Sequence, residues 1–300
     1  MLESITPLIL TYNEAPNIGR TLEKLAWARD IVVVDSFSTD ETPEIVASFT
    51  QARMIQRRFD SFASQCNFGL TETGIATDWV LSLDADYVLT SELVDELGTL
   101  RPDSTTVGFR ANFTYCIFGR RLRSGIYPPV TVLFRRSGAY FKEDGHAHRV
   151  VVSGDVKNLS QPVLHDDRKS LSRWLEGQSR YTKLEAEKLL SANPESLGWT
   201  DRVRRWRVVA PAAMLFYCLI IRAGVFDGWP GFYYAFQRVL AELMLSLHLL
   251  DHDLRNSKFG IRNARTEQPR PNPREVEDAT TVLSTSQFEI RNPKSEIRNL

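Results

Sequence analysis

The first hundred residues alternate short β-branched runs with segments of helical pattern, and this alternation leaves the chain few possible folds. It is typical of a parallel β-sheet whose strands are joined by crossover helices. The helical segments are "PNIGRTLEKLAWA", "ETPEIVASF" and "SFASQCNFGLTETG". We therefore expect an α/β domain, a mostly parallel sheet with helices on both faces, with strands at Ile5–Thr11, Ile31–Asp35, Arg53–Gln56 and Trp79–Asp84.

Polar residues follow the predicted strands at one edge of that sheet. Right-handed crossovers align the carboxyl ends of parallel strands, and ligands of open α/β sheets bind outside those ends. The polar segments that follow the strands there are "TYNE" at 11–14, "DSFSTDET" at 35–42 and "DADYVLT" at 84–90. We expect the chemistry of the protein at this edge.

Beyond residue 105 the pattern changes. Residues 105 to 165 are extended segments without long helices between them, which favours an antiparallel or mixed extension of the sheet. A helix follows this region, and several of its apolar residues could share a buried stripe. These residues are Leu171, Trp174, Leu175, Tyr181, Leu184 and Leu189.

Residues 196–255 are the most apolar part of the chain. Their uninterrupted core, 208–221, is shorter than the roughly 20 residues that a helix needs to span hydrocarbon. Basic residues before it and flanking tryptophans predict a monotopic attachment to a membrane face; a helical hairpin buried against the domain or in a dimer is the alternative. The residues are Arg202, Arg204, Arg205, Arg207, Trp206 and Trp229. The polar segment 256–300 is predicted to be a disordered tail.

Charge and cysteine content indicate which partners and which cellular compartment are to be expected. Lys plus Arg equals Asp plus Glu at 37 each, so no overall field attracts nucleic acid. Cys66, Cys116 and Cys218 are odd in number and lie outside any metal-ligand spacing, which favours a reducing compartment. Because the amino terminus lacks the basic start of a secretory signal, we expect a cytoplasmic protein.

Motifs that are absent restrict the chemistry at the sheet edge. The chain has neither G-x-G-x-x-G after the first strand nor G-x-x-x-x-G-K-[ST], which argues against a hydride-transfer enzyme and a P-loop NTPase. Diphosphate charge could instead be neutralised through Mg²⁺ or Mn²⁺ held by Asp84 and Asp86, since side chains at i and i+2 of a strand point the same way. The alternative is a solvated turn or cap before a helix that starts near Thr90 and Ser91.

Asp35 ends the second predicted strand, where an acid commonly binds ribose hydroxyls in nucleotide-binding sheets. The segment "TYNE" at the end of the first strand supplies acceptors suited to a base edge. A cap for the following turn is the alternative role of Asp35.

In combination and order, "ILTYNEAPNIGRTL", "IVVVDSFSTDET", "FASQCNFGL" and "WVLSLDADYVLT" resemble the successive motifs of family 2 nucleotide-sugar glycosyltransferases over roughly residues 5 to 175. The resemblance implies the Rossmann-like GT-A fold and is closest to the bacterial branch that includes lipopolysaccharide-core β-glucosyltransferases. It implies a nucleotide-sugar-binding half at 1–105 and an acceptor-binding half with its following helix at 106–195. It further implies a nucleoside site at Thr11, Asn13, Glu14, Asp35, Gln65 and Asn67, and a metal and diphosphate site at Asp84 and Asp86.

The sequence departs from the family pattern at Cys66, where relatives often carry Arg or Lys. A cation that could assist the diphosphate is missing there, and Arg57 and Arg58 are the candidates to replace it.

Inverting transfer also needs a general base for the acceptor hydroxyl. The segment "YFKEDGHAHRV" supplies Glu143, Asp144, His146 and His148, and the resemblance favours an acid here, with Asp144 first and Glu143 second. Solvated loop residues are the alternative.

The segment "LHDDRKSLSRW" is interpreted as a charged turn before a helix capped by Ser170 or Ser172, although His165 and Arg168 could reach the diphosphate or the acceptor. The full Q-x-x-R-W element is absent, which argues against a processive synthase.

The sequence thus predicts a metal-dependent, inverting hexosyltransferase. It would use a nucleoside diphosphate sugar, with UDP as the expected nucleotide, and a cell-envelope glycan or lipid-linked acceptor at the cytoplasmic face of the inner membrane. Two alternatives stay open: nucleotidyl transfer, and a catalytically inactive nucleotide-sugar-binding protein associated with the membrane.

Overall fold

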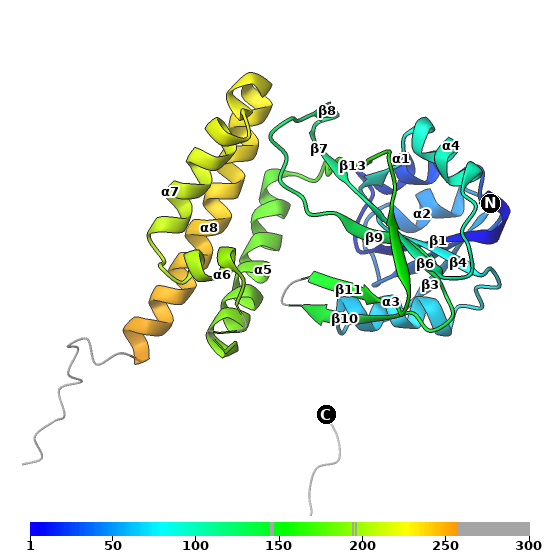
Figure 1. Cartoon of the computed structure of the whole chain (residues 1–300), viewed down its shortest axis with the longest axis horizontal. Helices are drawn as coiled ribbons and strands as arrows, with labels where there is room; N and C mark the ends of the chain where they lie inside the picture. Colours follow the sequence, from blue (N-terminus) through cyan, green and yellow to red (C-terminus); the bar gives the residue numbers. More distant parts are fainter. Residues whose placement is uncertain (145–146, 194, 196, 257–300) are drawn as a thin grey trace, which may run out of the picture. The chain divides into compact units, whose positions relative to one another are not determined.

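The expected parallel strands lie together in a seven-stranded sheet of order β12-β6-β9-β4-β1-β2-β3 (Figure 1). A computed structural model describes residues 1–144, 147–193, 195 and 197–256, except the side chains of residues 144, 147 and 148. The strands of this sheet are β1 (Ile5–Thr11), β2 (Ile31–Asp35), β3 (Ala52–Gln56), β4 (Trp79–Asp84), β6 (Thr106–Ala111), β9 (Val130–Arg135) and β12 (Asp155–Asn158). Strands β1 to β4 match the predicted ranges to within one residue.

The sheet is mixed beyond β4, as the extended pattern of residues 105–165 predicts. Strand β9 runs antiparallel to both β4 and β6, and β12 pairs in parallel with β6. Two smaller sheets complete this region: the hairpin β10–β11 and the sheet β5-β13-β7-β8. Their strands are β10 (Tyr140–Asp144), β11 (Ala147–Val151), β5 (Tyr87–Val88), β13 (Val163–His165), β7 (Phe113–Ile117) and β8 (Arg120–Arg121).

Helices cover both faces of the central sheet. One apolar cluster joins alternate residues of β1 and β2, such as Ile9 and Val33, to the helices of one face. A second cluster joins Leu8 and Val32 to Leu70 of the opposite face. The first face carries α1 (Ile18–Glu23), α2 (Thr42–Ala47) and α4 (Ser91–Thr99), and the second carries α3 (Phe62–Thr71); a 3-10 turn, Leu2–Ser4, precedes β1. The α/β class and the mostly parallel sheet are therefore confirmed.

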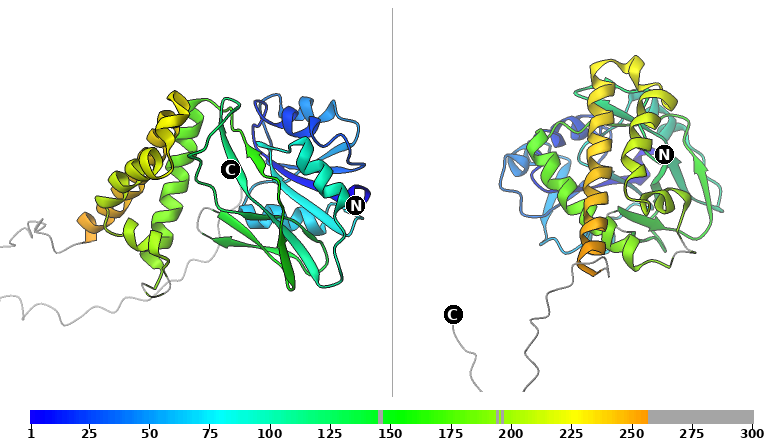
Figure 2. Two further views of the ribbon diagram at one scale, coloured as in Figure 1. Left: turned by 45° about the horizontal axis from the view of Figure 1, so that its top comes forward. Right: turned by 90° about the vertical axis from the view of Figure 1, so that its left-hand side faces the viewer.

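The chain then forms a helical region, seen edge-on and face-on in Figure 2. It contains α5 (Leu171–Ser191), α6 (Trp199–Arg204), α7 (Val209–Phe216) with a π-helical continuation at Tyr217–Ile221, a 3-10 turn at Gly224–Asp227, and α8 (Trp229–Asn256). Residues Met1–Asp253 form one unit by their contacts. The predicted tail lies outside the described residues from 257 onward.

The buried face of α5 differs from the expected apolar stripe. Leu171, Leu175 and Leu184 are exposed, whereas Thr182, Glu185, Ala186 and Leu189 are buried. Glu185 is buried because Arg204 of α6 lies 3.5 Å from its carboxylate, and Arg204 also pairs with Glu242 of α8 at 2.7 Å. Of the expected stripe, Leu189 is buried as predicted and Trp174 and Tyr181 are half-buried, whereas the prediction for the three exposed leucines is wrong. Ion pairs between helices decide the rest of this face.

All three cysteines are buried and free. Burial raises the pKa of Cys116 to about 11, and it raises the pKa values of Cys66 and Cys218 as well. Because the thiolate is the reactive form, we expect the folded protein to react slowly with Ellman's reagent and all three thiols to react in guanidinium chloride. Rapid reaction of a thiol in the native protein would contradict this placement.

Candidate active site

The carboxyl ends of β1 and β2 meet at Thr11 and Asp35, which pair directly in the sheet. The Thr11 hydroxyl donates to Asp35 Oδ1 over 3.0 Å, and the Ser38 backbone N–H donates to Asp35 Oδ2 over 2.9 Å. Asp35 is fully buried. It thus caps the turn that follows β2, which was the alternative role, and its contact with a nucleoside stays a prediction.

The loop after β1 is fixed to the loop after β2. Asn13 has a φ of 55°, in the left-handed region that asparagine tolerates better than most residues. Its backbone N–H donates to the Ser38 hydroxyl over 2.7 Å, and its side-chain oxygen accepts from the Thr39 N–H over 2.6 Å. The Glu14 N–H donates to the Thr42 hydroxyl over 2.7 Å. The "TYNE" segment is therefore held in one conformation.

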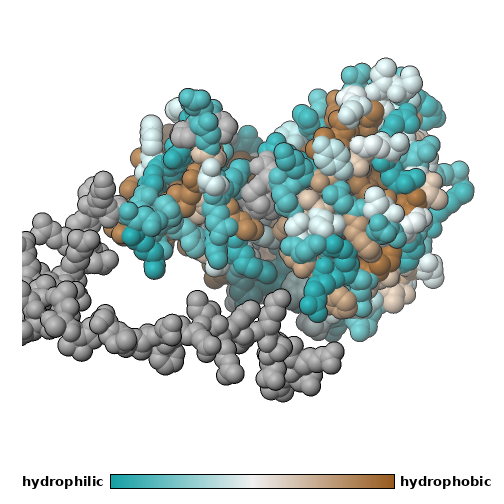
Figure 3. Space-filling view, turned by 90° about the horizontal axis from the view of Figure 1, so that it is seen from below, coloured by the Kyte–Doolittle hydropathy of each residue, from teal (hydrophilic) through white to brown (hydrophobic). Residues whose placement is uncertain are grey.

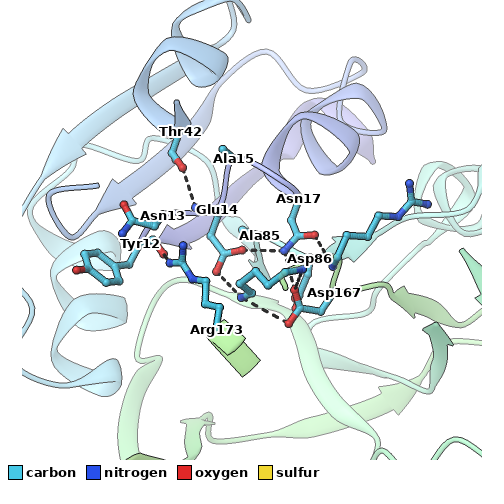
Figure 4. A network of polar contacts seen from close by, with 12 residues as sticks. Tyr12, Asn13, Glu14, Ala15, Asn17, Thr42, Ala85, Asp86, Asp167 and Arg173 are labelled. Carbon is cyan, nitrogen blue, oxygen red and sulfur yellow. Dashed lines mark hydrogen bonds and ion pairs between the residues drawn. The ribbon is translucent and has the colours of Figure 1, made fainter. Parts of the chain in front are cut away.

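Glu14 lies in a partly buried polar network that the sequence did not predict (Figure 4). Lys169 Nζ donates to Glu14 Oε1 over 2.8 Å, and Asn17 Nδ2 donates to Glu14 Oε2 and to Asp167 Oδ1, each over 2.9 Å. Burial raises the pKa of Glu14 to about 7, although Lys169 opposes this shift. Arg173 Nη2 donates to the Tyr12 carbonyl over 2.8 Å, so α5 is attached to the same loop.

Asp84 and Asp86 do not share a strand. Strand β4 ends at Asp84, and Asp86 lies in the turn before β5. The prediction that Asp84 and Asp86 point the same way as residues i and i+2 of one strand is therefore wrong. Helix α4 begins at Ser91 with Thr90 as its cap, so neither acid caps that helix.

The turn places Asp86 against a histidine 79 positions away in the chain. Strand β5 pairs antiparallel with β13, which brings His165 Nε2 to 3.2 Å from Asp86 Oδ2. Asp86 is buried and His165 is partly buried, and the atoms Asp86 Oδ1 and His165 Nδ1 lack a hydrogen-bond partner within the described part of the chain. A buried carboxylate oxygen without a partner is costly unless another group binds it.

Electrostatics keep Asp86 ionised. Burial acts to raise its pKa, but the positive charge of His165, with Lys169, outweighs burial and lowers the pKa of Asp86 to about 2. Burial alone would lower the pKa of His165, yet ionised Asp86 raises it above 6.5. The site therefore presents a buried anion with a free oxygen at neutral pH.

Tyrosine rings surround His165 and fix its orientation. The ring centroids of Tyr115, Tyr127 and Tyr87 lie 4.7, 5.0 and 5.3 Å from that of His165. The hydroxyls of Tyr87 and Tyr127 are 2.5 Å apart. Sequence reasoning considered His165 only as a group that could reach substrate, because nothing in the local pattern reveals its pairing with Asp86.

Asp166 is the centre of the charged turn. Its Oδ2 accepts from Arg20 Nη1 over 2.8 Å and from Arg168 Nη2 over 2.9 Å, and its Oδ1 accepts from the Gly119 N–H over 3.0 Å. Ser170 then caps α5, as predicted. This segment joins α1, the β7–β8 hairpin and α5 next to the site.

We expect Asp166→Ala to lower the free energy of unfolding by about 3 kcal/mol, because it leaves two guanidinium groups beside a buried void. Guanidinium denaturation measures the loss. The matched control is Asp30→Ala, which removes the half-exposed partner of Arg53 and should cost about 1 kcal/mol or less. Equal losses for the two variants would refute a structural role for Asp166.

Gln65 and Asn67 of α3 have defined partners of their own. The Gln65 amide donates to the Ser36 hydroxyl over 2.9 Å and its oxygen accepts from Arg57 Nη1. Asn67 bonds both backbone groups of Phe141, donating over 3.0 Å and accepting over 2.7 Å, and so attaches α3 to β10. Their positions beside a nucleoside stay predictions.

The predicted base segment forms the β10–β11 hairpin. Glu143 Oε1 accepts from the Ala63 N–H at the start of α3 over 2.8 Å. The backbone of Asp144 ends β10 opposite Ala147, while its side chain, the side chain of His148 and all of Gly145 and His146 lie outside what the structure describes. Burial raises the pKa of Cys66, and the charges of Asp84 and Glu143 add to this effect. Helix α3 therefore lies between the hairpin, which it contacts through Ala63, and the end of β4, where the charge of Asp84 acts on Cys66.

Comparisons with known proteins agree with this arrangement. Residues 8–146 match the family model described as Glycosyl transferase family 2. The lipopolysaccharide core biosynthesis glycosyltransferase LpsC of Rhizobium meliloti is 25% identical over 245 residues, which cover 76% of this chain and 85% of LpsC. An uncharacterized glycosyltransferase of Rickettsia bellii is 36% identical over 98 residues, 32% of each chain, so the match spans about a third of that relative.

Among solved structures, Staphylococcus aureus TarS 1-349 in complex with UDP-GlcNAc resembles the chain with a TM-score of 0.42 and 13% identity, covering 84% of this chain and 91% of TarS 1-349. The family assignment depends on the sequence match and on the α/β sheet whose strand ends carry the motifs. Residues 8–146 of the chain therefore match glycosyl transferase family 2.

Proposed function

We propose that the protein transfers a sugar, with inversion, from a nucleoside diphosphate sugar to a cell-envelope glycan or a lipid-linked acceptor. UDP is the expected nucleotide. The observation that carries the proposal is the ionised, buried Asp86 with a free oxygen, at the sheet edge that also carries Asp35 and Glu14. A diphosphate bound there needs a cation between its oxygens and these acids.

The residues fit a divalent metal. Asp86 Oδ1 is available, and Asp84 ends β4, the strand that leads into the turn of Asp86. No group of three or more His, Cys, Asp or Glu side chains suited to a metal occurs among the described residues. Mg²⁺ and Mn²⁺ often take only one or two carboxylates, with water and phosphate oxygens completing the shell. When bound, the ion would offset charge that develops on the leaving diphosphate.

The other steps belong to side chains. Asp35 and Thr11 would hold the ribose, and the fixed "TYNE" loop would border the base. A carboxylate of the β10–β11 hairpin, Asp144 first and Glu143 second, would take the proton of the acceptor hydroxyl as its oxygen bonds to the anomeric carbon. The bond from that carbon to the diphosphate breaks on the opposite side, which inverts the configuration.

We place the acceptor near Tyr115. A cavity of about 20 Å³, which has room for about one water molecule, lies between the β7–β8 hairpin, residues 167–174 and α8, so a sugar would have to bind at its opening. The side chains around it are aromatic and charged, which suits sugar ring faces and hydroxyls. The lining includes Tyr115, Phe118, Asp167, Lys169, Trp174 and Tyr233. The name of LpsC supports an acceptor of lipopolysaccharide-core type.

A peripheral position at the cytoplasmic face of the inner membrane completes the proposal. In the described chain no helix is both long enough and apolar enough to cross a bilayer. Apolar side chains are nevertheless exposed along one face of α8, at Trp229, Phe236, Leu240, Leu243, Leu247 and Leu254. Brown side chains also lie at the surface of the helical region in Figure 3. Such a face is suited to the interfacial layer of a membrane.

The test is a screen of nucleotide sugars, with and without Mn²⁺, read by thermal shift and then by product formation. We expect a UDP-sugar to raise Tm only with the metal and to be consumed when acceptor is added. Metal-dependent binding without product would favour the inactive binding protein instead. The absence of stabilisation by any nucleotide sugar would refute both.

A further inference from the structure

The turn of the β7–β8 hairpin and the segment between α7 and α8 form one surface, which we call the tip. The Phe118 ring lies 6.1 Å from that of Tyr233. The Asp227 carboxylate accepts from the backbone N–H groups of Arg123 and Ser124 over 3.0 and 2.9 Å. Beneath the tip, Ile117 and Leu122 pack with Cys218 and Tyr234 in a common core. The hairpin and the helices are therefore attached to each other.

Large apolar side chains of the tip are exposed. The exposed fractions are 84% for Trp229, 77% for Phe226, 67% for Phe118 and 60% for Ile221. Single exposed apolar residues are normal, but a group of aromatic ones indicates a binding surface.

The turn that presents Phe118 is strained. Phe118 and Gly119 have φ values of 47° and 81°, the left-handed pair of a two-residue hairpin turn. Such turns favour asparagine or glycine at the first position, and a bulky residue there is an outlier. Strain of this kind is retained where the side chain has a function.

The tip also carries exposed positive charge. Arg120, Arg121, Arg123 and Arg222 are exposed, and the nearby Asp227 carboxylate is engaged with backbone N–H groups. By contrast, Arg204 and Arg207 pair with Glu242 and Asp253. Exposed aromatic side chains also adjoin the Arg202–Arg207 segment that the sequence indicated, at Trp199 and Trp206, but two of its four arginines are neutralised by these ion pairs, whereas the four arginines of the tip are exposed.

We infer that the tip docks on a bilayer that contains anionic lipid. Arginines beside exposed aromatic residues match a negatively charged interface, where each basic residue is attracted to the headgroups. A second copy of the chain fits less well, because a two-fold dimer would place this surface against itself and oppose arginines to arginines.

Docking there would orient the candidate active site. Strand β7 pairs with β13 so that Tyr115 lies opposite His165, and the Gly119 N–H donates to Asp166. The tip is therefore one strand away from the Asp86–His165 pair. This inference rests on the proposed function, since it places the membrane that would supply a lipid-linked acceptor.

The experiment is vesicle sedimentation of the full chain with phosphatidylcholine alone and with about 30% phosphatidylglycerol. We expect binding to the anionic vesicles, weakened about tenfold or more by the double variant Arg120→Glu/Arg121→Glu. The matched control is Arg101→Glu/Arg136→Glu, exposed arginines at the opposite edge of the sheet, which should bind like the wild type.

A second variant separates docking from folding. Phe118→Asn places a favoured residue in the strained turn, so Tm should be unchanged or higher while vesicle binding falls. Wild-type binding by both tip variants would overturn the inference and leave the transferase proposal intact. If the wild type dimerises but does not bind vesicles, and Phe118→Asn abolishes the dimer, the tip binds a second copy of the chain and the inference is overturned as well. Metal-dependent UDP-sugar binding by the same samples reports separately on the proposed function.

Discussion

Asp86→Asn is expected to lower the rate of sugar transfer by about 10³-fold, since it removes the charge that would hold the metal against the diphosphate. Asp84→Asn should cost less, because we propose that Asp86 binds the metal directly and that Asp84 reaches the ribose or the metal through water. Asp86→Ala should likewise lower the rate of sugar transfer more than Asp84→Ala. Initial rates at saturating donor, and the Mn²⁺ concentration that gives half-maximal thermal shift, measure the effect.

Two controls separate chemistry from folding. Asparagine keeps the size of Asp86 beside His165, whereas alanine leaves a void. Loss of the carboxylate should also lower the pKa of His165, because ionised Asp86 now raises it above 6.5. In the wild type, this pair stabilises the fold between the lowered pKa of Asp86, about 2, and pH 6.5, and the contribution is lost as pH rises through the raised histidine pKa. NMR titration of His165 measures both its pKa and the pH range of this contribution. Equal activity of the Asp84 and Asp86 variants would contradict the metal site and leave residues 84–86 as an ordinary turn.

Asp144→Ala is expected to lower kcat by about 10²- to 10⁴-fold, the usual contribution of a general base. KM for the donor should change little, because the base contacts the acceptor hydroxyl and not the nucleotide. Glu143→Gln is the matched control. Glu143 accepts from the Ala63 N–H, and an amide oxygen can keep that hydrogen bond, so a modest loss of rate is expected.

Two measurements complete this test. In a pH–rate profile, Asp144→Ala should lack the step that ionisation of the base gives to the wild-type rate. NMR of the wild-type product should show the anomer opposite to that of the donor. Transfer by Asp144→Ala at near wild-type rate would remove the assignment, and a larger loss in Glu143→Gln would move it to Glu143.

Much of the fold could be predicted because its signals are local. Strands β1, β2 and β4 have the expected bounds, since strands buried on both faces appear as short apolar runs closed by polar residues. Helix α1 is shorter than its pattern: it ends at Glu23, and residues to Ala28 continue in i to i−3 hydrogen-bonded turns. Periodicity identifies such a segment but not where its hydrogen bonding tightens.

The candidate site shows the limit of that reasoning. Its acids were identified because they follow strands that end at one edge. Their partners were not, since His165 reaches Asp86 only through the pairing of β5 with β13, and Lys169 reaches Glu14 across 155 positions of the chain. The same limit explains α5, where Glu185 is buried by ion pairs with another helix.

The sequence by itself determined the bounds of the parallel strands, the edge at which the acids gather and the family that residues 8–146 match, because these depend on neighbours in the chain and on motif order. The tertiary structure decided which charges are paired, which carboxylate oxygen is free and which arginines are exposed without an ion pair to another helix. Those properties depend on side chains brought together by sheet register and helix packing, and local periodicity carries no information about them.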